Sequence, residues 1–155
     1  MLEVTSDDVD IICDTFSTSN KALEVFSESF RNLYKNACIE ELKKFVGSDR
    51  DKTVYSLMSN YKTWDNYAVS VIYLKVFEYL FPKGLHRNPL LISFSQILAL
   101  NISPDPSRRL NIDDTLSKFN DIFFLDGDPN DYENAVQQME YDPERTTRRI
   151  NEDLF

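Results

Sequence analysis

The chain has 155 residues and a formal net charge of −9, and 42% of its residues are hydrophobic. A chain of this length predicts one domain, and its acidity excludes nucleic acid and anionic membranes as partners because its long-range field repels them. Eleven Phe and eight Tyr supply apolar packing area, whereas only three Gly supply material for turns. The composition therefore predicts an all-α fold with a single core.

The cysteines and the longest apolar run bear on where the protein resides. Cys13 and Cys38 are too few for a disulfide framework and no signal-peptide pattern opens the sequence, so we expect an intracellular protein. The longest apolar run, residues 67–81, is shorter than the ~20 residues that span a bilayer and contains Lys75 and Glu78. We therefore expect no membrane insertion.

The acidic charge is concentrated at the C-terminal end. Residues 121–155 contain ten acidic and three basic side chains, a net charge of −7, which leaves −2 for the first 120 residues. We therefore divide the chain into an irregular lead-in at 1–19, a helical domain at 20–124 and an acidic arm at 125–155. We expect the arm to add little to the fold and to bind a protein partner with a basic surface through its apolar side chains, which are Tyr132, Val136, Met139 and Phe155.

Hydrophobic spacing predicts the helices of the first half. The apolar patch at 9–12 has no sustained period, which predicts irregular structure with room for one strand. From Asn20 to Phe45, apolar residues recur every three or four positions, which predicts one long amphipathic helix or two with a break near Asn36. A shorter helix is predicted at 54–61.

A central helix is predicted at 64–81, with Thr63 as its cap. It is apolar nearly all round, which predicts a helix packed on several faces. Asn88-Pro89 then begins a second apolar helix that ends at Leu100, because a proline suits the first helical position.

Asparagine and aspartate caps predict the remaining helices. Asp105-Pro106 predicts one helical turn, and Asn111 predicts the cap of a helix that extends to Phe123. Asp128-Pro129 and Asp142-Pro143 repeat the combination of cap and proline within the acidic arm.

Two of these segments resemble the C-terminal lobe of eukaryotic-type Ser/Thr protein kinases. Asp65-Asn66-Tyr67-Ala68-Val69-Ser70 is similar to the opening of the family's central helix, and Asp105-Pro106-Ser107-Arg108-Arg109 is similar to its late Asp-Pro-x-x-Arg turn. The resemblance spans 60–124 and is closest to the divergent kinases of large nucleocytoplasmic DNA viruses. Ser70 stands where the family has Gly, and the segment before residue 60 resembles no part of that lobe.

The resemblance implies structural roles for Asp65, Tyr67, Asp105, Pro106 and Arg109. In the family, the residue similar to Asp65 holds the catalytic loop, and the residue similar to Arg109 pairs with the Glu of the Ala-Pro-Glu motif. This chain contains no Ala-Pro-Glu. We therefore expect Asp65 to bind amides of its own helix start and Arg109 to meet a carboxylate from the tail or from the first sixty residues.

The catalytic parts of the family are absent from the sequence. There is no Asp-Phe-Gly, and Gly47, Gly84 and Gly127 are too far apart for a phosphate loop. His86-Arg87-Asn88 follows the central helix instead of preceding it, and an amide cannot act as a base. The segment 126–131 lacks the glycine that a calcium loop has at its sixth position, and no glutamate follows at the twelfth. We therefore expect no catalytic, cofactor-binding or metal-binding residue.

These expectations favour a non-catalytic, kinase-lobe-like helical module that binds proteins. The viral resemblance implies a virion-associated component in the host cytoplasm or the virion, with capsid or assembly proteins as partners. One alternative is the C-terminal half of a Ser/Thr kinase that is active only with an N-terminal half. Another is an unrelated helical scaffold protein.

The first prediction is that Mg-ATP does not stabilise this chain. A ligand that binds only the folded state adds about 2.7 kcal/mol at 100 times its dissociation constant, which thermal unfolding resolves easily. We expect the same melting temperature with and without Mg-ATP. A clear rise would contradict the non-catalytic interpretation.

Overall fold

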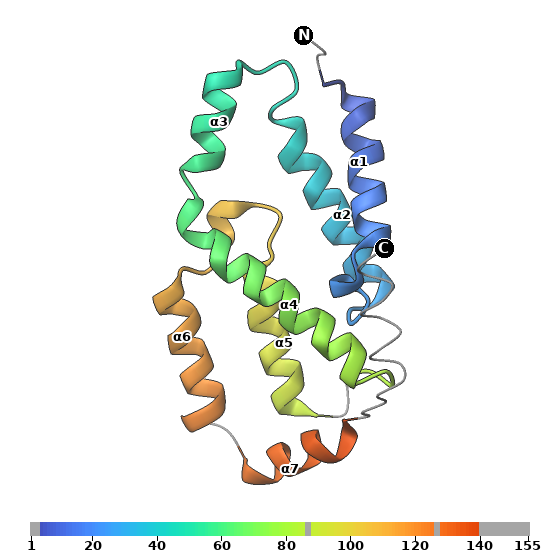
Figure 1. Ribbon diagram of the computed structural model, residues 1–155, viewed down its shortest axis with the longest axis vertical. Helices are drawn as coiled ribbons and strands as arrows, with labels where there is room; N and C mark the ends of the chain where they lie inside the picture. The colour runs from blue at the N-terminus through green and yellow to red at the C-terminus, as the bar shows by residue number, and fades with distance from the viewer. Residues whose placement is uncertain (1–3, 86–87, 126–127, 140–155) are drawn as a thin grey trace, which may run out of the picture.

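All regular structure in the described part of the chain is helical (Figure 1). The structure is a computed structural model that describes residues 4–85, 88–125 and 128–139. These residues form seven α-helices joined by short turns and contain no strand, so the predicted all-α fold and single domain are confirmed. The predicted cap at Asp142-Pro143 lies outside the described residues.

The first helix, α1 (Ser6–Ser19), occupies the segment predicted to be an irregular lead-in, so that prediction is wrong. Thr5 begins the helix with a capping box: its hydroxyl accepts a hydrogen bond from Asp8 N (3.2 Å), and the Asp8 carboxylate accepts one from Thr5 N (2.9 Å). Val9 and Cys13, one turn apart, are both buried. The exposed neighbours Ile11 and Ile12 obscured this spacing in the sequence.

Helix α2 (Glu28–Lys43) returns antiparallel to α1 (Figure 1). It begins at Ser27 and not at Asn20, because Asn20 instead caps a short 3₁₀ turn, η1 (Lys21–Leu23), by accepting a hydrogen bond from Ala22 N (3.1 Å). The helix passes through the predicted break at Asn36 without interruption. The predicted start was therefore wrong, and of the two predicted alternatives the uninterrupted helix is the one observed at Asn36.

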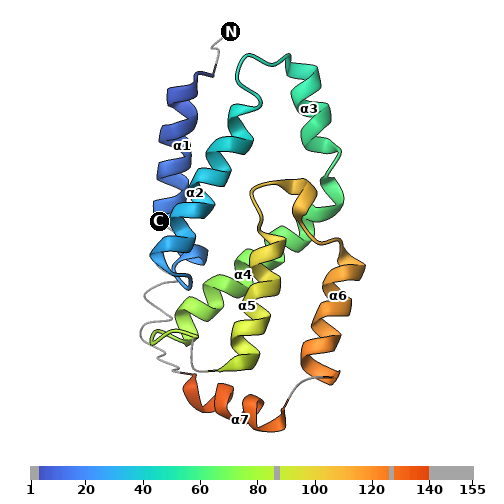
Figure 2. The same ribbon diagram turned by 180° about the vertical axis from the view of Figure 1, so that it is seen from behind.

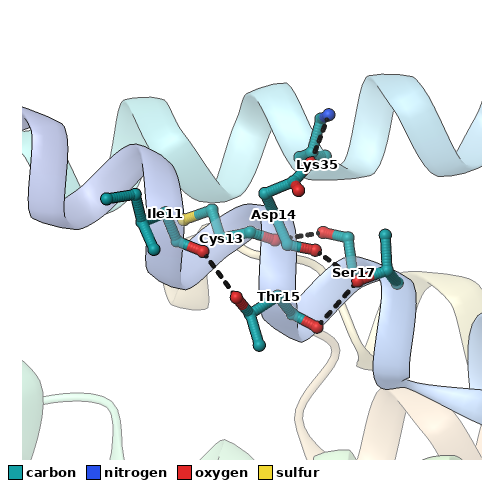
Figure 3. Close-up of polar contacts among 7 residues, drawn as sticks. Ile11, Cys13, Asp14, Thr15, Ser17 and Lys35 are labelled. Carbon is teal, nitrogen blue, oxygen red and sulfur yellow. Dashed lines mark hydrogen bonds and ion pairs between the residues drawn. The ribbon is translucent and has the colours of Figure 1, made fainter.

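Two ion pairs join α1 and α2. Lys35 Nζ lies 2.9 Å from Asp14 Oδ1, and Lys43 Nζ lies 2.8 Å from Asp10 Oδ1. Figure 3 shows Lys35 reaching across to Asp14, with the hydroxyls of Thr15 and Ser17 turned back onto carbonyls of their own helix. Ion pairs this exposed contribute little free energy. They align α1 with α2, while the apolar contacts between the two helices stabilise the hairpin.

Helix α3 (Arg50–Met58) confirms the predicted short helix. Gly47, with φ of +69°, reverses the chain before it, and Asp49 Oδ1 accepts hydrogen bonds from Asp51 N (3.0 Å) and Lys52 N (3.2 Å). No residue of α3 is buried. The helix is therefore held by its ends and caps and packs little against the remainder of the described chain.

Helices α4 (Trp64–Leu80) and α5 (Pro89–Asn101) pack together and form the core with η1. A 3₁₀ turn, η2 (Tyr61–Thr63), precedes α4, but the predicted cap is wrong, since the Thr63 hydroxyl donates back to Asn60 O (2.9 Å). The core comprises side chains from η1, α2, α4, α5, the residues that follow α4 and α5, and the last helix, α7 (Pro129–Gln138): Ala22, Leu23, Tyr34, Leu74, Phe77, Phe81, Leu85, Leu91, Leu98, Ile102 and Ala135.

The outer face of α4 is exposed, so the prediction that α4 packs on several faces is wrong. Leu74 and Phe77 face the core, whereas Val69, Ile72 and Val76 are each at least two-fifths accessible. In Figure 1, no other helix crosses this outer face, and Figure 2 shows α5 lying behind α4.

Two buried asparagines fix the ends of α5. Asn88 Oδ1 accepts a hydrogen bond from Leu91 N (3.1 Å), which confirms the predicted cap. Asn101 Nδ2 donates to Ser70 Oγ (3.1 Å) across the α4–α5 contact. Ser70, the residue that departs from the kinase pattern, is only 2% exposed. It therefore satisfies a buried amide that a glycine there would leave unpaired.

The predicted turn at Asp105-Pro106 is confirmed as η3 (Pro106–Arg108), and the Asn111 cap begins α6 (Ile112–Asn120). A five-residue π-helical turn, η4 (Asp121–Leu125), follows α6, so the α-helix ends before the predicted Phe123. Phe94 of α5 meets Phe119 and Phe123 edge to face, with ring centroids 5.5 and 5.4 Å away. The turn thus keeps two successive aromatic rings against α5.

The acidic arm begins with a helix that belongs to the core. Helix α7 (Pro129–Gln138) buries Ala135, and Asn88 Nδ2 donates to Asp131 O (2.9 Å). The Tyr132 hydroxyl donates to Phe123 O. The prediction that the arm contributes little to the fold is therefore wrong as far as Met139, because contacts with α5, invisible in the sequence, hold this short helix.

Among the described residues, no helix is both long and apolar enough to traverse a membrane.

The packing of α7 can be tested with two adjacent residues. Ala135 is 8% exposed and Val136 is 67% exposed. We expect Ala135→Lys to lower the free energy of unfolding by about 2 kcal/mol, because the ammonium must be buried or α7 must leave its site. Val136→Lys, the matched control, should change it by less than about 0.5 kcal/mol. Equal effects in thermal or urea unfolding would show that α7 does not dock.

Candidate functional site

A groove of about 800 Å³ lies between the C-terminal half of α2 and the whole of α3. The start of α4 closes one end, and the turn that contains η3 contributes residues 104–107 and Arg109. In both views, α3 stands at the opposite end of the molecule from α7 (Figures 1 and 2).

The lining of the groove is largely apolar. Leu42, Val54, Leu57, Met58 and Trp64 all line it, and each leaves at least a third of its surface accessible. Three of the five come from α3, the helix without a buried residue. Apolar side chains gathered on one concave surface are typical of sites that bind other proteins.

The charged side chains at the rim, Glu41, Lys44, Lys52 and Asp105, have formal charges that sum to zero, and three of them have polar partners within the chain. Lys44 forms an ion pair with Glu41, and this hydrogen bond raises the pKa of Lys44. Asp105 accepts hydrogen bonds from the Ser107 hydroxyl (2.7 Å) and backbone N–H (2.9 Å), and these bonds lower its pKa. The rim is therefore polar with little net charge of its own.

Arg109 lies at the inner edge of the groove and is half-buried. Its Nε donates to Ser103 O (2.7 Å), and its guanidinium carbon lies 4.6 Å from the centroid of the Tyr67 ring. Burial lowers its pKa, while nearby Tyr67 and Tyr34 act in the opposite direction. Within the described chain no carboxylate forms an ion pair with Arg109, so the predicted carboxylate partner is wrong there: an aromatic face and a carbonyl take its place.

A second, smaller recess of about 280 Å³ shares Glu41, Leu42, Pro104 and Arg109 with the groove. Cys13 and Cys38 line it beside Tyr34, whose hydroxyl donates to Ile102 O (2.9 Å). Burial raises the pKa of Cys13, and it raises that of Cys38 to about 12. Both side chains are thus protonated thiols at neutral pH, which disfavours a thiolate nucleophile here.

The structure brings together four of the five residues predicted from the kinase resemblance. Arg109 stacks on Tyr67, while Asp105 and Pro106 line the groove beside it. Asp65 is exposed on the first turn of α4 and forms no hydrogen bond with the described residues, so the expected bonds to its own helix start are wrong. Its exposure to water removes the need for such partners.

The predicted partner-binding residues lie elsewhere. Tyr132 is half-buried, and Val136 and Met139 are exposed, all on or beside α7. Phe155 lies outside the described residues.

Sequence reasoning missed the groove itself. The apolar spacing of Val54, Leu57 and Met58 correctly predicts a helix, but such a stripe normally marks the face that packs on the core. The described residues leave this stripe of α3 accessible, because the turns before and after α3 direct the helix away from α4 and α5.

The described chain offers no group of three or more His, Cys, Asp or Glu side chains that could hold a metal ion. The groove thus combines apolar walls, a cation stacked on Tyr67 at its inner edge and a rim whose formal charges balance.

No protein-family model, curated protein or solved structure was found that matches this chain.

Proposed function

We propose that this protein is a non-catalytic, protein-binding helical module and that the α2–α3 groove receives an amphipathic helix from its partner. The proposal rests on one observation: no residue of α3 is buried, although its apolar side chains Val54, Leu57 and Met58 line the groove. A helix from another protein would complete the packing that α3 lacks. Such helix-in-groove binding places apolar side chains at i, i+3 and i+4 against the groove walls.

Burial supplies the driving force for this binding. Each half-exposed side chain of the lining would contribute roughly 1 kcal/mol when covered. Part of this gain offsets the ordering of the partner helix and the loss of its free motion. The groove therefore supports a reversible complex whose specificity depends on shape and charge.

The expected charge of the partner depends on the net charge of the whole chain and not on the charges at the rim of the groove. Because Lys44 and Glu41 neutralise one another, the groove has little field of its own. The net charge of −9 attracts a basic polypeptide from a distance and speeds its encounter. The proposed partner is accordingly a helix with an apolar face and a Lys- or Arg-rich polar face.

Within this proposal, the chain is a relative of the kinase C-terminal lobe that lacks the catalytic half, and a virion or virus-assembly complex is its setting. This part rests on the two sequence segments that contain Asp65 and Arg109. The stacking of Arg109 on Tyr67 supports a common structural role for those two segments. The viral setting rests on the sequence resemblance alone.

Trp64, the only tryptophan, lines the groove and reports its occupancy. We expect a synthetic amphipathic peptide of about 18 residues, with Leu on one face and Lys on the other, to shift Trp64 fluorescence to the blue as it excludes water from the indole. A peptide with the same Leu face and Glu in place of Lys should bind at least about tenfold more weakly, and added salt should reduce this difference.

Two variants locate the binding on the chain. Leu57→Glu places a charge on the groove wall and should abolish the shift, while Leu33→Glu, on an exposed part of α2 outside the groove, should leave it intact. A Lys peptide that leaves Trp64 unchanged, or that binds Leu57→Glu as tightly as the original chain, would contradict the proposal.

A further inference from the structure

The outer face of α4 is a second apolar surface that shares no residue with the groove. It consists of Ala68, Val69, Ile72 and Val76, which we call the α4 strip, and all four are exposed. Tyr73, at the edge of the strip, packs on Phe94 of α5 with ring centroids 5.6 Å apart and is not part of it. Their spacing places them along one side of the helix over about 12 Å. In Figure 1, α4 lies in front of α5, and no other labelled helix crosses in front of it.

The α4 strip is unusual because it lies on the helix that organises the core. Ile72 is 61% exposed, yet it is only two residues from the fully buried Leu74. A helix that is apolar on both sides is expected to pack on both sides. The sequence of α4 is thus that of a buried helix, and the described residues cover only one of its sides.

Charged side chains accompany the strip only toward its ends. Asp65 lies one turn before Ala68, and Lys75 lies beside Val76, and both are exposed. Position 70 is the midpoint in sequence between Asp65 and Lys75, and it is also the midpoint between Ala68 and Ile72. A two-fold axis at the level of residue 70 would therefore satisfy both pairs at once.

We propose that the α4 strip is the interface of a homodimer in which the α4 helices of two copies cross antiparallel about this axis. Ile72 of each copy packs over Ala68 of the other, where the small side chain leaves room for a large one. Asp65 of each copy lies beside Lys75 of the other. A two-fold axis makes every such contact twice, so one favourable pair of residues contributes two contacts.

Charge complementarity is the reason to choose a second copy as the occupant. A parallel pair of α4 helices would set Asp65 against Asp65 and Lys75 against Lys75, and like charges repel. The antiparallel pair converts both repulsions into attractions without any change in sequence. An unrelated partner would have to supply the opposite order of charges and an apolar stripe of the same length.

Sedimentation equilibrium of the full chain tests the dimer. We expect a dimer at about 100 µM that dissociates on dilution, because a small helical interface supports only modest affinity. Ile72→Glu should yield a monomer at the same concentration. Leu33→Glu, at a site 67% exposed on α2, is the matched control and should remain dimeric. Circular dichroism checks that both variants retain the helical content and melting temperature of the original chain.

Charge reversal tests the antiparallel register. Asp65→Lys or Lys75→Asp alone should weaken self-association about tenfold, because each dimer loses two ion pairs and acquires two repulsions. An equimolar mixture of the two variants should form a heterodimer at least as tight as the original dimer, since every Lys then faces an Asp. The doubly reversed chain should dimerise like the original.

Three results would overturn the proposal. They are an original chain that stays monomeric at about 100 µM, a control Leu33→Glu that dissociates as fully as Ile72→Glu, and a mixture of the charge variants that associates no better than either alone. The Trp64 response of Ile72→Glu to the Lys peptide separates this test from the groove, because the strip and the groove share no residue.

Discussion

The fold depends on the contact between the inner face of α4 and α5. Leu74 and Phe77 of α4 meet Leu91 and Leu98 of α5 in one apolar cluster, and the Asn101–Ser70 hydrogen bond fixes the register of the two helices. A buried amide without a partner costs about 1–3 kcal/mol, so the bond disfavours any other alignment. The other elements attach to this pair: η1 packs against α4, the ring of Phe94 contacts Phe119 of α6, and the Asn88 side chain donates a hydrogen bond to Asp131 O of α7.

The same contact determines what remains uncovered. Because α5 and η1 occupy the inner side of α4, its outer side faces water, and because α3 leaves the core through turns at both ends, its apolar stripe lines an open groove. These two surfaces have different chemistry. The groove is concave with balanced charges at its rim, and we propose a helix from another protein as its occupant, while the α4 strip is a ridge for which we propose a second copy of the chain.

Local hydrogen bonding explains which parts of the fold were predictable. The predicted caps Asn88, Asp105, Asn111 and Asp128 all begin helical segments, because a cap needs only the next two or three residues. The errors concern which helices touch. The covered side of α4, the docking of α7 and the partners of Arg109 depend on contacts between segments distant in sequence. The missed α1 is an exception, since Thr5 and Asp8 form a recognisable capping box.

The central claim is that α3 packs on no other helix of the described residues and leaves its apolar stripe accessible, and native-state hydrogen exchange tests it most directly. A nine-residue helix held only by its ends is marginal in water, so its amides should exchange through local opening that costs less than about 2 kcal/mol. The amides of α4 and α5 should exchange only when the whole domain unfolds. If α3 amides exchange as slowly as those of α5, the helix is packed and the groove is not a vacant binding surface.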